Sequence, residues 1–110
     1  MEELIFSVQG SAKDPYEVTF RKDGNSLSVH CTCPAGENRQ QCKHRVRILR
    51  GTPDGIVSGN AEDLKVVKSW LVGTDLEAAL ETFVIAEEQH ERAEKELLAA
   101  KKRLTKALRG

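Results

Sequence analysis

Three cysteines and a histidine within fourteen residues constrain this chain more than any other feature. Cys31 and Cys33 are followed, after eight residues, by Cys42 and His44. An odd number of cysteines this closely spaced does not form the disulfide framework of a secreted protein. Three thiolates and an imidazole are instead the ligands that structural zinc prefers. We therefore expect a Zn²⁺ site formed by these four residues, in a cytoplasmic protein.

The expected backbone at the site follows from residue spacing. Cys31 and Cys33 lie two residues apart, so a strand presents both thiols on one face. Cys42 and His44 are also two residues apart, which on a regular helix corresponds to about 200° of rotation. Cys42 should therefore precede a helix, and His44 should lie in its first turn.

The first thirty residues alternate between apolar and polar side chains, as strands with one buried face do. Strands are expected near residues 4–8, 16–20 and 27–33, with hairpin turn residues at 23–26. A short helix over residues 43–50 should end at Gly51 and Pro53. The predicted fold class is α+β: a small antiparallel sheet with a zinc site and a short helix, in a ββα-like arrangement.

Residues 51–60 are rich in glycine and predict a linker, which divides the chain into a metal-binding module (residues 1–57) and a helical part (residues 58–110). In the second part, Asn60 can cap a helix over residues 61–72. Thr74 and Glu77 form a capping-box pair before another helix. Because no glycine or proline follows until Gly110, we expect a helical hairpin whose second helix is long.

A helix of that length cannot be covered by so small a module, so it needs a partner. A four-three spacing of apolar and small residues predicts a coiled-coil seam with alanine at every second position. Its first part is mainly acidic and its end is basic, which favours an antiparallel homodimer. The alternative is a surface helix in which alanine reflects helix propensity alone. The predicted dimer interface comprises Phe83, Ala86, His90, Ala93, Leu97, Ala100 and Leu104.

The charges of the chain cancel, with 17 basic and 17 acidic residues, so any nucleic-acid surface must be a local patch. Such a patch is predicted next to the metal ligands, where five basic residues occur without an acid. Their charges could contact phosphates, DNA more readily than RNA, or could only balance the thiolates of the site. A base-stacking platform is disfavoured because few aromatic residues are available. The candidate nucleic-acid-binding residues are Arg39, Lys43, Arg45, Arg47 and Arg50.

The order C-x-C and then C-x-H, with a helix expected at the last pair, resembles the SWIM zinc finger. Cys31, Cys33, Cys42 and His44 each fall on a ligand position of that family, and the resemblance covers about residues 16–50. It implies a ββα zinc module of a type found in helicase-like ATPases, transposase-related proteins and ubiquitin-related signalling proteins. Such modules are thought to bind DNA or proteins, which predicts a binding factor and not an enzyme.

Three alternatives remain beside this interpretation. The chain could be a protein-interaction adaptor without nucleic-acid affinity, or a CDGSH-like iron–sulfur redox protein, which also uses three cysteines and one histidine. The second fits less well, because that family has Asp-Gly after its third cysteine where this chain has Lys43 and His44. Cysteine–histidine catalysis is disfavoured, since no third orienting group is visible.

His30 is expected at the surface, and no membrane-spanning or export segment is expected, because strictly apolar stretches are no longer than triplets.

Overall fold

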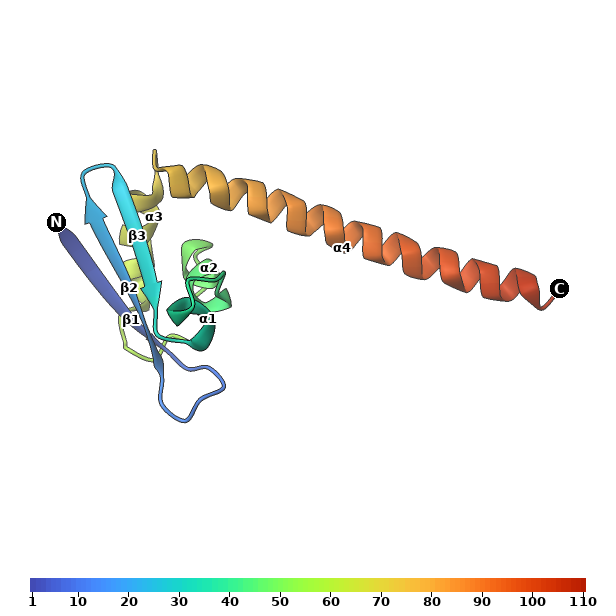
Figure 1. Ribbon diagram of the computed structural model, residues 1–110, viewed down its shortest axis with the longest axis horizontal. Helices are drawn as coiled ribbons and strands as arrows, with labels where there is room; N and C mark the ends of the chain where they lie inside the picture. Colours follow the sequence, from blue (N-terminus) through green and yellow to red (C-terminus); the bar gives the residue numbers. More distant parts are fainter. The chain divides into compact units, whose positions relative to one another are not determined.

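The computed structural model describes residues 1–110 and confirms the predicted α+β class. Three strands, β1 (Glu2–Val8), β2 (Tyr16–Asp23) and β3 (Ser26–Cys31), form one antiparallel sheet in the order β1-β2-β3 (Figure 1). The β2–β3 hairpin closes through a tight turn in which Gly24 has a φ of 60°, a backbone conformation that glycine adopts without strain. The alternation in the sequence therefore produced the expected sheet.

The register of the sheet places its apolar residues on one face. Phe6 pairs with Val18, and Val18 pairs in turn with Cys31, so two core side chains and one thiol lie in a row across the strands. All three are fully buried, as is Phe20, whose ring meets that of Phe6 edge to face at 5.7 Å. The first metal-ligand candidate is thus an integral part of the hydrophobic core.

The segment predicted as a linker is built into the fold. Gln9 donates its backbone N–H to Gly55 at 2.8 Å, and Val57 donates to the carbonyl of Ser7 at 2.8 Å. The Asn60 side-chain amide donates to the carbonyl of Ile5 at 3.0 Å instead of capping the next helix. Residues 55–60 therefore cover the outer edge of β1 and satisfy its hydrogen-bonding groups.

Short helices pack on the buried face of the sheet. They are α1 (Pro34–Glu37), α2 (Lys43–Leu49), a 3₁₀ turn (Ala61–Asp63) and α3 (Leu64–Leu71). Val67 of α3 is 1 % exposed and belongs to the same core as the sheet. The compact unit consequently extends from Met1 to Glu77, whereas the sequence analysis placed the boundary after residue 57. The sequence analysis assigned this helix to the second part of the chain, apart from the sheet against which it packs.

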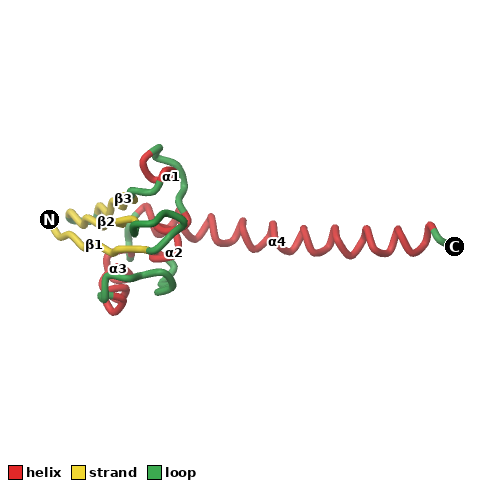
Figure 2. The backbone as a smooth tube through the Cα atoms, turned by 90° about the horizontal axis from the view of Figure 1, so that it is seen from below, coloured by secondary structure: helices red, strands yellow, loops and turns green.

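The long helix α4 (Asp75–Leu108) contains 34 residues, and Figure 2 shows it as one uninterrupted helix. The predicted capping pair is present at its start. Thr74 Oγ1 accepts the N–H of Glu77 at 3.3 Å, while Glu77 Oε1 accepts the N–H of Gly73 at 3.2 Å. Residues 78–110 form the second unit, and no side chain of α4 is buried. None of the helices combines the length and apolar character needed to span a lipid bilayer.

Candidate metal centre

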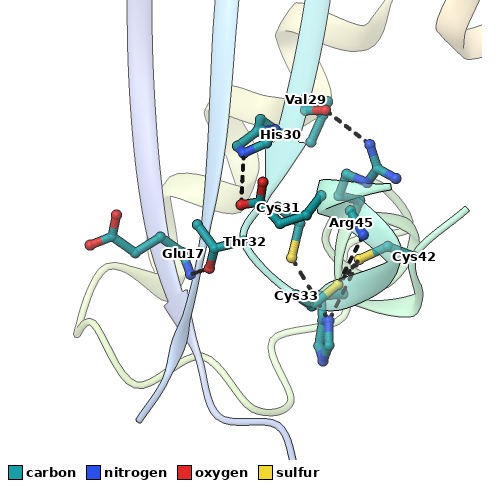
Figure 3. A network of polar contacts seen from close by, with 11 residues as sticks. Glu17, Val29, His30, Cys31, Thr32, Cys33, Cys42 and Arg45 are labelled. Carbon is teal, nitrogen blue, oxygen red and sulfur yellow. Dashed lines mark hydrogen bonds and ion pairs between the residues drawn. The ribbon is translucent and has the colours of Figure 1, made fainter. Parts of the chain in front are cut away.

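Four side chains from three different elements meet at one point beside the sheet. Cys31 is the last residue of β3, Cys33 is the N-cap of α1, Cys42 is the N-cap of α2, and His44 follows in the first turn of α2. Their ligand atoms all lie within 4.8 Å of one another, and all four residues are buried. Figure 3 shows the three sulfur atoms pointing toward a common centre. The prediction that these four residues form one cluster is confirmed.

The distances in the cluster fit a tetrahedral metal ion. With metal–sulfur bonds of about 2.3 Å and metal–nitrogen bonds of about 2.0 Å, neighbouring ligand atoms should lie roughly 3.5–3.8 Å apart. Cys33 Sγ lies 3.3 Å from Cys42 Sγ. His44 Nδ1 lies 3.5 Å from Cys42 Sγ and 3.9 Å from Cys31 Sγ. These four residues could therefore hold one ion with small adjustments, and Nδ1 is the imidazole atom that faces it.

The backbone between the first two cysteines is fixed by hydrogen bonds to β2. Thr32 donates its N–H to the carbonyl of Glu17 at 3.0 Å, and its side-chain oxygen accepts the N–H of Glu17 at 2.9 Å (Figure 3). Immediately afterwards the chain turns into α1, where the N–H of Gly36 donates to Cys33 Sγ at 3.3 Å. An N–H group directed at sulfur stabilises the thiolate, which is the form that binds a metal.

Arg45 ties α2 to the rest of the site. Its guanidinium donates through Nη1 to the carbonyl of Val29 at 3.2 Å (Figure 3). Through Nη2 it also donates to the carbonyl of Gln40. The side chain thus links α2 to β3 and to the loop before Cys42. Arg45, one of the five basic residues predicted to bind nucleic acid, therefore has its charged group engaged in holding the fold together.

Burial and local dipoles give the ligand groups different proton affinities. Burial raises the pKa of the Cys31 thiol to about 12. Burial also opposes ionisation of Cys42, but the N–H groups of Arg45 and His44, together with the neighbouring thiols, outweigh it and lower the pKa of that thiol. Burial, and then the charges of Lys43 and Arg47, lower the pKa of His44. His44 is accordingly held in the neutral form that a metal ligand requires.

The far side of the His44 ring is closely covered. Nε2 is buried and has no hydrogen-bond partner, and the Tyr16 ring lies 5.1 Å from the imidazole. A Cβ atom added to Gly10 would come within 3.1 Å of Nε2 and 2.6 Å of the Tyr16 ring. Sequence reasoning missed both residues as part of the site, and also Gly36. The only signal in the sequence was the position of the two glycines: Gly10 follows a predicted strand, and Gly36 follows the first cysteine pair. Nothing indicated Tyr16.

The remaining predicted residues lie outside the cluster. Lys43 and Arg47 are exposed on α2, Arg50 is exposed as its C-cap residue, and Arg39 is exposed in the preceding loop with a φ of 58°. His30 is at the surface as expected, 3.6 Å from a carboxylate oxygen of Glu37. The predicted interface residues all lie on α4, where His90 Nε2 is 2.9 Å from Glu94 Oε1 in its own helix. Two of them, Leu97 and Leu104, are 56 % and 60 % exposed.

Comparisons of the chain with protein-family models, with curated proteins and with solved structures found no match. The functional assignment therefore depends on the chemistry of the site. A buried Cys₃His cluster of this geometry is consistent with a zinc finger.

Proposed function

We propose that this chain is a small zinc-binding module of the SWIM type that binds duplex nucleic acid, DNA in particular, and forms a homodimer through α4. The observation that carries the proposal is the double role of α2. This helix buries His44 and Ile48 and exposes Lys43 and Arg47 on a neighbouring side, and its C-cap residue Arg50 is exposed as well. A metal held by His44 would fix the orientation of this basic face.

Zinc in this site has a structural role. Four protein ligands complete a tetrahedral shell, so no position remains for a substrate or an activated water. The ion would join the end of β3, the start of α1 and the start of α2. We therefore propose a binding protein without enzymatic activity.

The type of nucleic acid follows from the side chains that are available. Lysine and arginine at three helical positions suit contacts to backbone phosphates. Of the large aromatic residues, Phe6 and Phe20 are fully buried and Tyr16 covers His44, so none of these three is left to stack on bases. This combination favours a duplex, which is recognised through its phosphates, over a single strand.

Pairing of two chains through α4 would place two basic faces on one assembly. An exposed helix of 34 residues with leucines more than half exposed is unusual for an isolated chain. The acidic first part and basic end of α4 suit an antiparallel arrangement. Two linked weak sites bind a long polyanion more tightly than either alone.

The experiment is a salt titration of binding between the zinc-loaded chain and a fluorescent mixed-sequence DNA duplex. Arg47→Ala combined with Arg50→Ala should reduce the slope of log K against log salt concentration by about two units. Lys13→Ala combined with Arg21→Ala removes the same charge from a loop and from the sheet and should leave the slope nearly unchanged. Zinc content should be equal in all three proteins. Absence of binding at low ionic strength would refute the nucleic-acid role.

The second candidate is an adaptor that binds only protein. It is favoured by the electrostatic effect of Lys43 and Arg47 on the site, since both charges act on His44. Three thiolates around a divalent cation carry one excess negative charge, which nearby cations can balance without any nucleic acid. An iron–sulfur cluster in the same four ligands is the remaining alternative, and visible absorption with metal analysis of the purified protein separates it from zinc.

A further inference from the structure

A cleft lies on the metal-binding unit between α2 and α3, apart from the four ligand residues. The two helices are in contact, and the cleft has a volume of about 460 Å³. This lies within the range of about 300–1,000 Å³ that is typical of ligand sites. Its floor is apolar and is formed by Ile48 and Leu49 of α2 and by Leu64 and Leu71 of α3.

The rim of this cleft is basic. Arg50, Lys65 and Lys68 line it, and the single acid among the lining residues is Glu77. The Glu77 carboxylate is engaged at the start of α4, where it accepts the N–H of Gly73 at 3.2 Å. Lys65 and Lys68 are exposed, and neither forms an ion pair with a carboxylate. Lys65 and Lys68 thus give the cleft positive charge that the protein itself does not neutralise.

Apolar surface remains accessible at the same place. Val72 lines the cleft beside the lysines and is 65 % exposed, and Leu49 on the floor is half-buried. A phosphate backbone would use the three cations but would leave this apolar surface without a partner. A ligand with apolar side chains flanked by carboxylates would use both. Amphipathic helices bind grooves of this kind by placing anchors at i, i+3 and i+4 spacing.

We propose that the α2–α3 cleft is a docking site for an acidic amphipathic peptide segment of a partner protein. Its apolar side chains would fill the floor between Leu49 and Leu71, and its carboxylates would lie against Lys65 and Lys68. This site is separate from the metal ligands. Of the residues proposed to contact nucleic acid, Arg50 alone lines the cleft, and the peptide contacts proposed here are with Lys65 and Lys68 instead. The cleft would be a second interaction surface besides the proposed nucleic-acid contacts. It is basic, whereas the first part of α4 is acidic.

The test uses the zinc-loaded full chain, labelled with ¹⁵N, and a short synthetic amphipathic peptide of leucine, alanine and glutamate. Binding should shift the amide signals of residues 48–51 and 64–72 more than those of the metal-ligand loops. Lys65→Glu combined with Lys68→Glu should weaken binding about tenfold. The milder pair Lys65→Gln and Lys68→Gln should weaken binding by about threefold. This pair serves as the test if the charge reversal disturbs folding. Val72→Ser should also weaken binding, because it removes exposed apolar surface at the rim.

Two controls define specificity. Lys101→Glu combined with Lys102→Glu makes the same charge change on α4 and should leave the peptide affinity unchanged. A peptide with lysine in place of glutamate should not bind. The proposal is overturned if the acidic peptide fails to bind, or binds the lysine variants as tightly as the unmodified chain. It is equally overturned if a DNA duplex, and not the peptide, shifts the cleft residues and loses affinity in the Lys65 and Lys68 variants.

Discussion

The carbonyl oxygen of Cys31 lies where a side chain on residue 36 would have to be. A Cβ atom on Gly36 would come within 2.2 Å of that oxygen and within 2.9 Å of the Cys31 Cβ atom. Gly36 also donates its N–H to Cys33 Sγ. The turn between β3 and α1 is therefore closed against the backbone of the first ligand, and only glycine fits at this position.

We expect Gly36→Ala to damage the metal site without touching a ligand. The added methyl group must push α1 away from Cys31, which displaces Cys33 and breaks the N–H···S contact. The zinc affinity, measured by competition with a chromophoric chelator, should fall by at least tenfold. Ala35→Gly, next to it in the same turn, is the matched control and should change the affinity far less. An unchanged affinity in Gly36→Ala would show that the turn adapts more freely than its geometry indicates.

Removal of one ligand should unfold the metal-binding unit. Structural zinc contributes an apparent ~10–16 kcal/mol in zinc-finger peptides near pH 7, which exceeds the stability of most domains of this size. In Cys42→Ser, or in the unmodified chain with excess chelator, thermal unfolding should shift to much lower temperature or lose its cooperativity. The single tryptophan, Trp70, is half-buried in this unit, and its fluorescence follows the transition separately from the helical signal of α4. Gln41→Ser is the control, because that side chain is exposed beside Cys42.

Arg39→Gly should stabilise the fold. Arg39 follows the last turn of α1 with a φ of 58°. The N–H of Arg39 donates to the carbonyl of Gly36, and the N–H of Gln40 donates to the carbonyl of Ala35. This is the hydrogen-bond pattern of a Schellman motif, in which glycine is preferred at the left-handed residue. Replacing a non-glycine residue there should raise the free energy of unfolding by about 1 kcal/mol. Arg39 is also one of the residues predicted to bind nucleic acid, so the same variant should lower the DNA salt slope by about one unit.

The proposed dimer can be tested with two neighbouring leucines. Leu97 belongs to the predicted seam and Leu98 does not, yet their exposures are nearly equal at 56 % and 55 %. Leu97→Glu should convert a dimer into a monomer at micromolar concentration in light scattering, because it places two charges in the interface. Leu98→Glu should leave the dimer intact. Equal effects of the two substitutions, or a monomeric unmodified chain, would refute pairing through this seam.

The sequence predicted most reliably what depends on short spacing. Cys31 and Cys33 were expected on one face of a strand, and His44 in the first turn of a helix, because residues two apart are related by local geometry alone. The sequence placed Cys33 in the strand, whereas it caps α1, since a one-turn helix of four residues has too little pattern to be recognised. This difference does not affect the predicted ligand set, because it depends on the spacing of Cys31 and Cys33 and not on the element that contains Cys33.

Contacts between distant parts of the chain could not be read from spacing. Gly10, in the β1–β2 connection, and Tyr16, at the start of β2, cover His44, and nothing in their local sequence indicates a metal site. The helix over residues 61–72 was predicted, but amphipathicity shows which side of a helix is buried and not what covers that side. The predicted boundary after residue 57 was wrong for this reason, because Val67 packs into the core of the sheet.

The hydrogen bond from Arg45 to Val29 has a consequence for the metal-free protein. β3 is the edge strand of the sheet on the side opposite the segment 55–60 that protects β1. An unprotected edge is a template on which strands of other molecules can add. The arginine that blocks one carbonyl of this edge belongs to α2, and α2 would be anchored by the metal. Loss of zinc would thus expose a strand edge as well as unfold a helix. The metal-free chain should therefore aggregate by adding strands between molecules and not remain in solution as an unfolded chain.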